Sequence, residues 1–226
     1  MTVNINYKKK ISNKTLSNHI SFIGEKFNIL TLKKYISGSE FSLISDLIKT
    51  KNLKKKIVSF DITSKKKIIL VSIKKNISNS EAENLGAKFY DLFKDSKKNE
   101  FNLNSDTVPS LSKNIVGYFL HGLKLKSYSF DKYKSKKNTT NLSFNVSGKN
   151  KPSIQDQIKF KAIEEGTFYS RDLVSEPGNI LHPDEYAKRI NTLKKHGLKV
   201  TVYDEKKLKK LGMNSLLGVG QGSVRG

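Results

Sequence analysis

The sequence contains no cysteine, and only four of its 226 residues are proline. A chain without cysteine has no disulfide scaffold, no catalytic thiolate and no cysteine-ligated zinc site. No apolar run approaches the roughly 20 residues that a membrane-spanning helix needs, and the N-terminus lacks the continuous apolar core of a signal peptide. These absences favour a globular, cytoplasmic protein.

Arginine is also scarce, although the formal net charge is +23. Of the 43 basic residues, only Arg171, Arg189 and Arg225 are arginine. A surface that reads bases or clamps phosphates would be expected to use more of the planar arginine fork. The lysines lie instead in short scattered runs such as Lys8–Lys10 and Lys65–Lys67. The composition therefore favours a solvated lysine-rich surface and leaves nucleic-acid binding as an alternative.

The first 150 residues carry alternating strand and helix patterns, which predict an α/β domain. Strands are predicted from alternating or β-branched apolar residues at 2–7, 56–62, 67–73 and 142–146. Helices are predicted from apolar spacing over 38–52 with Ser39 as N-cap, after Ser78 or Ser80, and through 115–123. Residues 94–104 form a polar stretch, and residues 147–153 are the best candidate for a domain linker.

Beyond the linker, two helices flank a segment with sharp helix signals. Ser153 and Asp156 resemble a capping box, and the helix that follows is predicted to end before Pro177. Pro183 is predicted to open a second helix that closes near Gly197. The inward face predicted for the first helix consists of Ile158, Ala162, Gly166, Tyr169 and Leu173.

The last thirty residues are predicted to begin a mostly parallel sheet. Alternation predicts a strand over 198–203, and the apolar run 215–220 predicts another. Between them, Asp204 could cap a short helix that ends at Gly212.

No convincing catalytic set can be found from residue types and spacing. The histidines are isolated and lack a second ligand at metal-binding spacing: they are His19, His121, His182 and His196. His182, directly before Pro183, is best explained as a helix cap. The acidic pairs Glu164/Glu165 and Asp184/Glu185 are expected on helix surfaces or first turns. The glycines of 218–222 fit neither a P-loop nor a dinucleotide-binding spacing.

Two segments, Ser170–Arg189 and Gly197–Ser223, closely resemble the leucyl aminopeptidase (cytosol aminopeptidase) family where its small N-terminal domain joins its catalytic domain. The resemblance rests on the order and spacing of Arg171–Val174, Glu176–Asn179 and Gly218–Ser223. It implies an N-terminal, macro-domain-like α/β domain over residues 1–150. Residues 151–226 would then be the incomplete start of an α/β catalytic domain.

The resemblance also implies a function. Members of this family are usually hexamers that remove N-terminal amino acids from peptides with two divalent metal ions, Mn or Zn. Such ions polarise the scissile carbonyl and lower the pKa of a bridging water. The family segments that carry this machinery, similar to G-K-G-x-x-F-D-S-G-G and N-T-D-A-E-G-R, do not occur here. No catalytic, metal-binding or substrate-binding residue is therefore assigned in this chain.

These observations predict a fragment of a metal-dependent aminopeptidase that is inactive alone and binds no metal specifically. Two alternatives stay open. The chain could be a lysine-rich module that binds nucleic acid, or an inactive subunit that joins a full-length hexamer.

Overall fold

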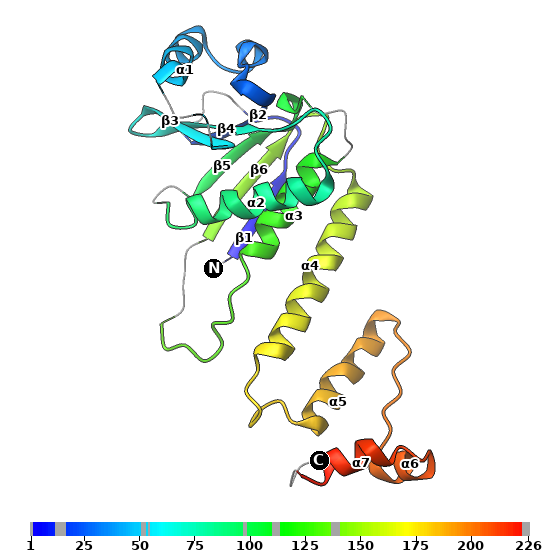
Figure 1. The fold of residues 1–226 in the computed structure, drawn as a ribbon. Helices are drawn as coiled ribbons and strands as arrows, with labels where there is room; N and C mark the ends of the chain where they lie inside the picture. The colour runs from blue at the N-terminus through cyan, green and yellow to red at the C-terminus, as the bar shows by residue number, and fades with distance from the viewer. Residues whose placement is uncertain are drawn as a thin grey trace. The chain divides into compact units, whose positions relative to one another are not determined.

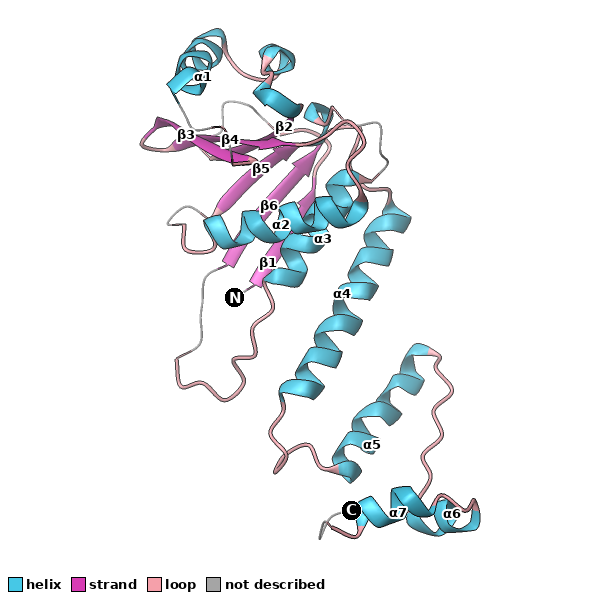
Figure 2. Ribbon diagram, in the orientation of Figure 1, coloured by secondary structure: helices cyan, strands magenta, loops and turns pink. Residues whose placement is uncertain are grey.

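The computed structural model describes residues 2–11, 17–50, 53, 55–96, 99–109, 114–136 and 141–222. The chain divides into two compact units, residues 1–168 and residues 169–226. All strands of the described residues belong to the first unit, while the described part of the second unit is built from helices and connecting segments (Figure 2).

The first unit is organised around a six-stranded sheet. Its strands are β1 (Thr2–Tyr7), β2 (Asn18–Ile23), β3 (Ile57–Thr63), β4 (Lys66–Ser72), β5 (Glu100–Asn104) and β6 (Asn141–Ser147). They lie in the order β1-β6-β5-β2-β4-β3. Neighbouring strands are parallel except the β3–β4 pair, which is antiparallel. The predicted α/β class is therefore confirmed for this unit.

Helices lie between and after these strands (Figure 1). The α-helices are α1 (Gly38–Thr50), α2 (Asn79–Phe93), α3 (Ile115–Lys126), α4 (Ile154–Ser175), α5 (Pro183–Asn191), α6 (Glu205–Lys210) and α7 (Asn214–Gly220). Short 3-10 helices are η1 (Glu25–Phe27), η2 (Leu30–Lys34), η3 (Ser105–Thr107) and η4 (Thr192–His196).

Two strands, β2 and β5, were not predicted, and both lie in the middle of the sheet. Strand β5 falls within the segment 94–104, which was predicted only as a polar stretch. Phe101 and Leu103 are fully buried on one face of the strand. Asn102, between them, is only 5% exposed because its side chain lies in a buried hydrogen-bond network. The residues of β5 do alternate polar and apolar, the pattern of a strand, but only over five residues at the end of an otherwise polar segment.

A large aromatic core lies where α2 and α3 pack on the sheet. Phe89 of α2 lies at its centre, with ring centroids 4.6–6.0 Å from those of Phe93, Phe101, Phe119 and Phe144. Most of these contacts are edge-to-face, the arrangement that aromatic quadrupoles favour. This cluster joins two helices to the central strands β5 and β6.

A smaller apolar cluster joins η1, η2 and α1 to β3 and β4. Its fully buried members include Leu32, Ile44 and Ile68. The predicted N-cap of α1, Ser39, is wrong. The Ser37 hydroxyl accepts the Glu40 backbone N–H at 3.3 Å, and the Glu40 carboxylate accepts the Ser37 N–H at 3.0 Å. This reciprocal pair satisfies two backbone donors that a helix start otherwise leaves open.

Helix α2 begins with the predicted cap. The Ser78 hydroxyl accepts the Glu81 N–H at 3.2 Å, and Glu81 accepts the Ser78 N–H at 3.1 Å. The Ser78 N–H, followed by the ammonium group of Lys74, lowers the pKa of Glu81 to about 2. A carboxylate with a lowered pKa stabilises the fold above its unfolded-state pKa, and that stabilisation is lost as the pH falls toward the native pKa.

Replacing Glu81 by glutamine is therefore expected to lower the denaturant midpoint at neutral pH. The difference between variant and wild type should shrink as the pH falls from about 4.3, the unperturbed glutamate pKa, toward 2. Urea titrations at pH 7 and at pH 3, followed by circular dichroism, measure this. A difference that stays constant over the window would contradict the capping account.

Helix α4 begins as predicted but buries a different face. The Ser153 hydroxyl accepts the Asp156 N–H at 3.1 Å and donates to the Asp156 carboxylate at 2.7 Å. The predicted inward residue Ile158 is 64% exposed, whereas Phe160 is buried against Tyr118 and His121. Phe160 therefore packs on the aromatic surface of α3, and the predicted inward face is wrong for Ile158, Ala162 and Gly166, which are exposed.

In the second unit, the predicted helix boundaries are confirmed and the predicted strands are wrong. Helix α4 ends before Pro177, α5 begins at Pro183, and Gly197 follows η4 with φ 81°. Residues 198–203 form no strand, and residues 215–220 lie in α7. Alternation alone cannot make a strand, because a strand needs a neighbour to pair its backbone groups. The described residues of this unit supply none.

Helix α6 has the expected start and end. The Asp204 carboxylate accepts the Lys207 N–H at 2.8 Å, and Gly212 has a left-handed φ of 72°. Across the described ranges, no helix is both long enough and apolar enough to cross a membrane.

Candidate functional site

The four histidines lie in or next to four different elements and have different surroundings. His19 lies in β2, His196 is exposed at the end of η4, and His182 occupies the N-cap position of α5. The prediction of His182 as a helix cap is confirmed by this position, although its side chain makes no capping hydrogen bond. His121 in α3 is buried and has an acidic partner that spacing along the chain did not reveal.

That partner is Glu164 of α4, whose carboxylate lies 3.3 Å from His121 Nδ1. The two side chains are only 5% and 12% exposed. The expectation that Glu164 and Glu165 both lie on a helix surface is therefore wrong for Glu164, while Glu165 is 69% exposed. Burial, followed by the nearby Glu164 carboxylate, raises the pKa of Tyr7 to about 12. The contact between His121 and Glu164 connects α3 to α4.

The segment between α4 and α5 is held by one arginine. Arg189 Nη1 donates to Glu176 at 2.9 Å, and Arg189 Nε donates to Glu185 at 3.0 Å. The Glu176 side chain is only 2% exposed. Hydrogen bonds to Glu176 and then Glu185 raise the pKa of Arg189, and Arg189 lowers the pKa of Glu185.

The backbone between these helices turns tightly at the Glu176–Asn179 motif. The Ile180 and Leu181 N–H groups both donate to the Pro177 carbonyl, at 2.9 Å each. The predicted first-turn position of Asp184 and Glu185 in α5 is confirmed. The Glu176–Asn179 motif therefore follows the end of α4, provides the buried Glu176 carboxylate that binds Arg189, and turns the chain toward α5.

No metal centre can be built from the described residues. Among them, no group of three or more histidine, aspartate and glutamate side chains could hold a metal ion. His121 and Glu164 form a pair, and the pair lacks the third and fourth ligands that a metal site needs. These residues do not fit a dinuclear metal centre.

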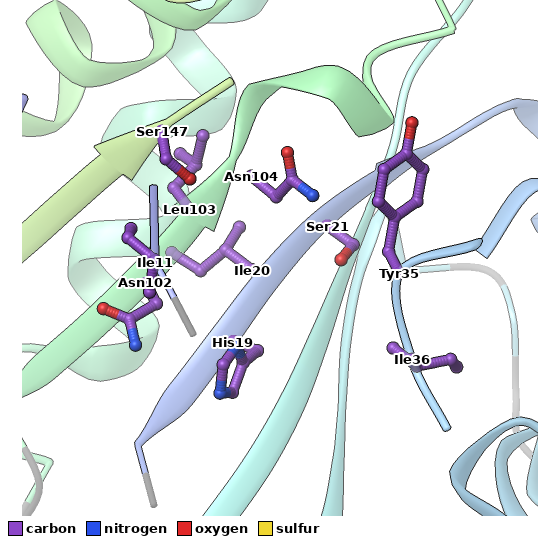
Figure 3. Close-up of a pocket in the computed structure, with 10 residues that line it drawn as sticks. All are labelled: Ile11, His19, Ile20, Ser21, Tyr35, Ile36, Asn102, Leu103, Asn104 and Ser147. Atoms are coloured by element: carbon purple, nitrogen blue, oxygen red, sulfur yellow. The ribbon is translucent and has the colours of Figure 1, made fainter. Parts of the chain in front are cut away.

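A small polar pocket lies over the central strands β2, β5 and β6 (Figure 3). Its polar lining residues are His19, Ser21, Tyr35, Asn102, Asn104 and Ser147. Its volume is about 40 Å³, well below the roughly 300–1,000 Å³ of sites that hold small molecules. This pocket suits an ordered water and is too small for a peptide substrate.

An amide network beside this pocket explains why polar side chains are buried there. Asn102 Nδ2 donates to Ser17 Oγ at 2.6 Å, and Asn145 Nδ2 donates to Asn102 Oδ1 at 3.1 Å. Asn145 also donates to Glu100 at 2.9 Å. Buried amides need such partners because an unsatisfied polar group costs about 1–3 kcal/mol. The network stabilises the sheet and performs no evident chemistry.

Comparison with known proteins gives a match to one family model. Residues 168–226 match the model of the cytosol aminopeptidase family, catalytic domain. A probable cytosol aminopeptidase of Phytoplasma mali is 46% identical over 114 residues, which cover 47% of this chain and 23% of that protein. One from Bradyrhizobium sp. is 41% identical over 111 residues, covering 46% of this chain and 22% of that protein.

Solved structures share the fold over nearly the whole chain. A mutant of tomato leucine aminopeptidase aligns with a TM-score of 0.73 and 20% identity, covering 93% of this chain and 46% of that one. The bottromycin maturation enzyme BotP, in complex with Mn, aligns with a TM-score of 0.68 and 18% identity. That alignment covers 93% of this chain and 43% of BotP. The chain thus spans less than half the length of the proteins that it matches.

Proposed function

We infer that the chain is part of a metal-dependent aminopeptidase of the leucyl aminopeptidase (cytosol aminopeptidase) family. The family match, the curated relatives and the shared fold support this inference. The complete enzyme would remove N-terminal amino acids from peptides. The observation that carries this inference is the family match over residues 168–226, which includes the Glu176–Asn179 junction held by Arg189.

We propose that residues 1–150 form the N-terminal domain and that residues 151–226 contribute the first part of the catalytic domain. The complete sheet with its aromatic core supports the first assignment. The second is supported by the apolar side chains exposed on the second unit, among them Val174, Leu198, Val202, Leu216 and Val219. Surfaces of this kind mark places where a protein meets further polypeptide.

The described residues do not fit a metal site. In the complete enzyme, other residues would bind the metal ions. Mn is a reasonable candidate, since BotP, which shares the fold, has been solved in complex with it. No step of peptide hydrolysis is assigned to a side chain of this chain. Its contribution is the N-terminal fold and the α4–α5 junction. A hexamer, which the family resemblance implies, belongs to the same proposal.

A chimera tests the aminopeptidase assignment. Residues 1–226 would replace the Phytoplasma mali relative up to the end of the 114 residues that align, keeping the rest of that protein. We expect the chimera to release p-nitroaniline from leucine p-nitroanilide when Mn²⁺ is present and to lose activity in EDTA. N-acetyl-leucine p-nitroanilide is the matched control, because an aminopeptidase needs a free amino group. A folded chimera that hydrolyses neither substrate, or both equally, would argue against the assignment.

A further inference from the structure

A second, larger cavity lies at the carboxyl ends of the parallel neighbours β2 and β4, where β3 begins. Its volume is about 360 Å³, within the roughly 300–1,000 Å³ range of small-molecule sites. Lys26 follows β2, Lys55 and Lys56 precede β3, and Lys74 follows β4. In open α/β sheets, ligands bind in crevices outside the carboxyl ends of the strands.

The floor of this cavity is apolar and held firmly. Phe27 and Ile73 line it and are 6% and 2% exposed. The Ile73 N–H donates to the Ile23 carbonyl at 2.9 Å, and the Ser72 N–H donates to the Lys56 carbonyl at 2.8 Å. These bonds connect the three chain segments that carry the lysines. The cavity is therefore part of the sheet framework.

The rim of the cavity carries an excess of positive charge. Lys74 donates to Glu81 at 3.1 Å, so its charge is largely compensated. No carboxylate among the described residues forms an ion pair with Lys26, Lys55 or Lys56. Among the described residues that line the cavity, Glu25 is the one acidic residue. Three lysines that line one cavity with one carboxylate repel one another, and an anion of two or more charges bound there would reduce this repulsion.

Lys26 also has an unusual backbone. Its φ is 61°, and the following residue, Phe27, has φ 54°. Two successive residues with side chains in the left-handed region are strained, and such strain gathers at ligand-binding sites. Both residues with this conformation line the cavity, Lys26 at its rim and Phe27 at its floor.

We propose that this cavity binds an organic phosphate: a di- or triphosphate group held by Lys26, Lys55 and Lys56, attached to an apolar or planar portion that contacts Phe27 and Ile73. Lysine binds phosphate as a point charge. The concave, apolar floor favours a small molecule over the backbone of a nucleic acid, which would follow an extended basic groove. The proposal does not rest on the proposed aminopeptidase function.

Isothermal titration calorimetry on the full chain tests the proposal, with ATP and with inorganic tripolyphosphate in about 150 mM salt, where long-range attraction is screened. We expect one saturable site, with ATP bound more tightly than tripolyphosphate. The double variant K55Q/K56Q should bind ATP at least about tenfold more weakly, a loss of about 1.4 kcal/mol, because it removes two of the three lysines that would contact the phosphates. K88Q/K159Q, which removes two exposed lysines of α2 and α4, is the matched control and should bind normally.

A second variant separates binding from folding. Lys26→Gly removes a rim charge and relieves the left-handed strain, because glycine adopts positive φ readily. It should bind ATP several-fold more weakly while its melting temperature stays equal or rises.

Several results would overturn the proposal: no saturable binding of either ligand, equal affinity for ATP and tripolyphosphate, or equal losses in the rim and control variants. Binding of a single-stranded 20-mer without binding of ATP would assign the lysines to nucleic acid instead and would equally overturn it.

Discussion

Replacing Gly86 by alanine is expected to lower the free energy of unfolding by about 3 kcal/mol, because overpacking of this kind forces backbone to move. A Cβ at Gly86 would lie 1.8 Å from the carbonyl oxygen of Phe119, and one at Gly122 would lie 2.0 Å from that of Glu83. The atoms in the way are helix backbone, which cannot rotate aside. Helices α2 and α3 therefore touch through these two glycines, and Gly122→Ala should have a similar effect.

The control is a glycine-to-alanine substitution at a position where the added Cβ has room. Gly166 lies in α4, and a Cβ there would meet nothing within 4 Å. Gly166→Ala should stabilise the protein by up to about 1 kcal/mol, because alanine favours helix over glycine by that amount. Urea denaturation of the three variants, followed by circular dichroism, gives the comparison. A Gly86→Ala variant as stable as wild type would show that α2 and α3 do not approach this closely.

Replacing Phe89 by alanine is expected to cost about 3–5 kcal/mol, the usual range for a fully buried phenylalanine. Phe89 is 0% exposed, and its ring packs against four other phenylalanines from α2, α3, β5 and β6. Its loss removes apolar burial and leaves a cavity where the helices meet the sheet.

Leu92→Ala is the matched control for this second substitution. Leu92 lies on the same helix but is 58% exposed, so its truncation should change the free energy of unfolding by no more than about 0.5 kcal/mol. Urea denaturation of the two variants would measure the contrast. Similar, small effects in both would contradict an aromatic core centred on α2.

Local signals in the sequence predicted the helices well. The capping serine Ser78, the helix-opening Pro183 and the left-handed Gly197 each act within a few residues of themselves. The strands were harder, because their burial depends on distant partners. Asn102 is buried through Ser17 and Asn145, which lie 85 and 43 residues away along the chain. The alternation over 198–203 predicted a strand where the described chain offers no neighbour.

The same difference between local signals and distant partners decides which sites could be predicted from the sequence. It singled out Glu176–Asn179 correctly as a turn between helices, because the signals lie together. It did not single out the lysine-rimmed cavity, since Lys26, Lys55 and Lys74 come from three different strand ends. In a chain with 43 basic residues, composition cannot show which few converge. The buried contact between His121 and Glu164 was hidden in the same way.

The central claim is that this chain supplies the N-terminal fold and the α4–α5 junction of an aminopeptidase whose reaction depends on other residues. The most direct test is the rate of Mn²⁺-dependent hydrolysis of leucine p-nitroanilide by the 226-residue chain alone, measured beside the chimera. We predict turnover by the chimera and none by the chain. Turnover by the chain at a rate comparable with the chimera would contradict the claim.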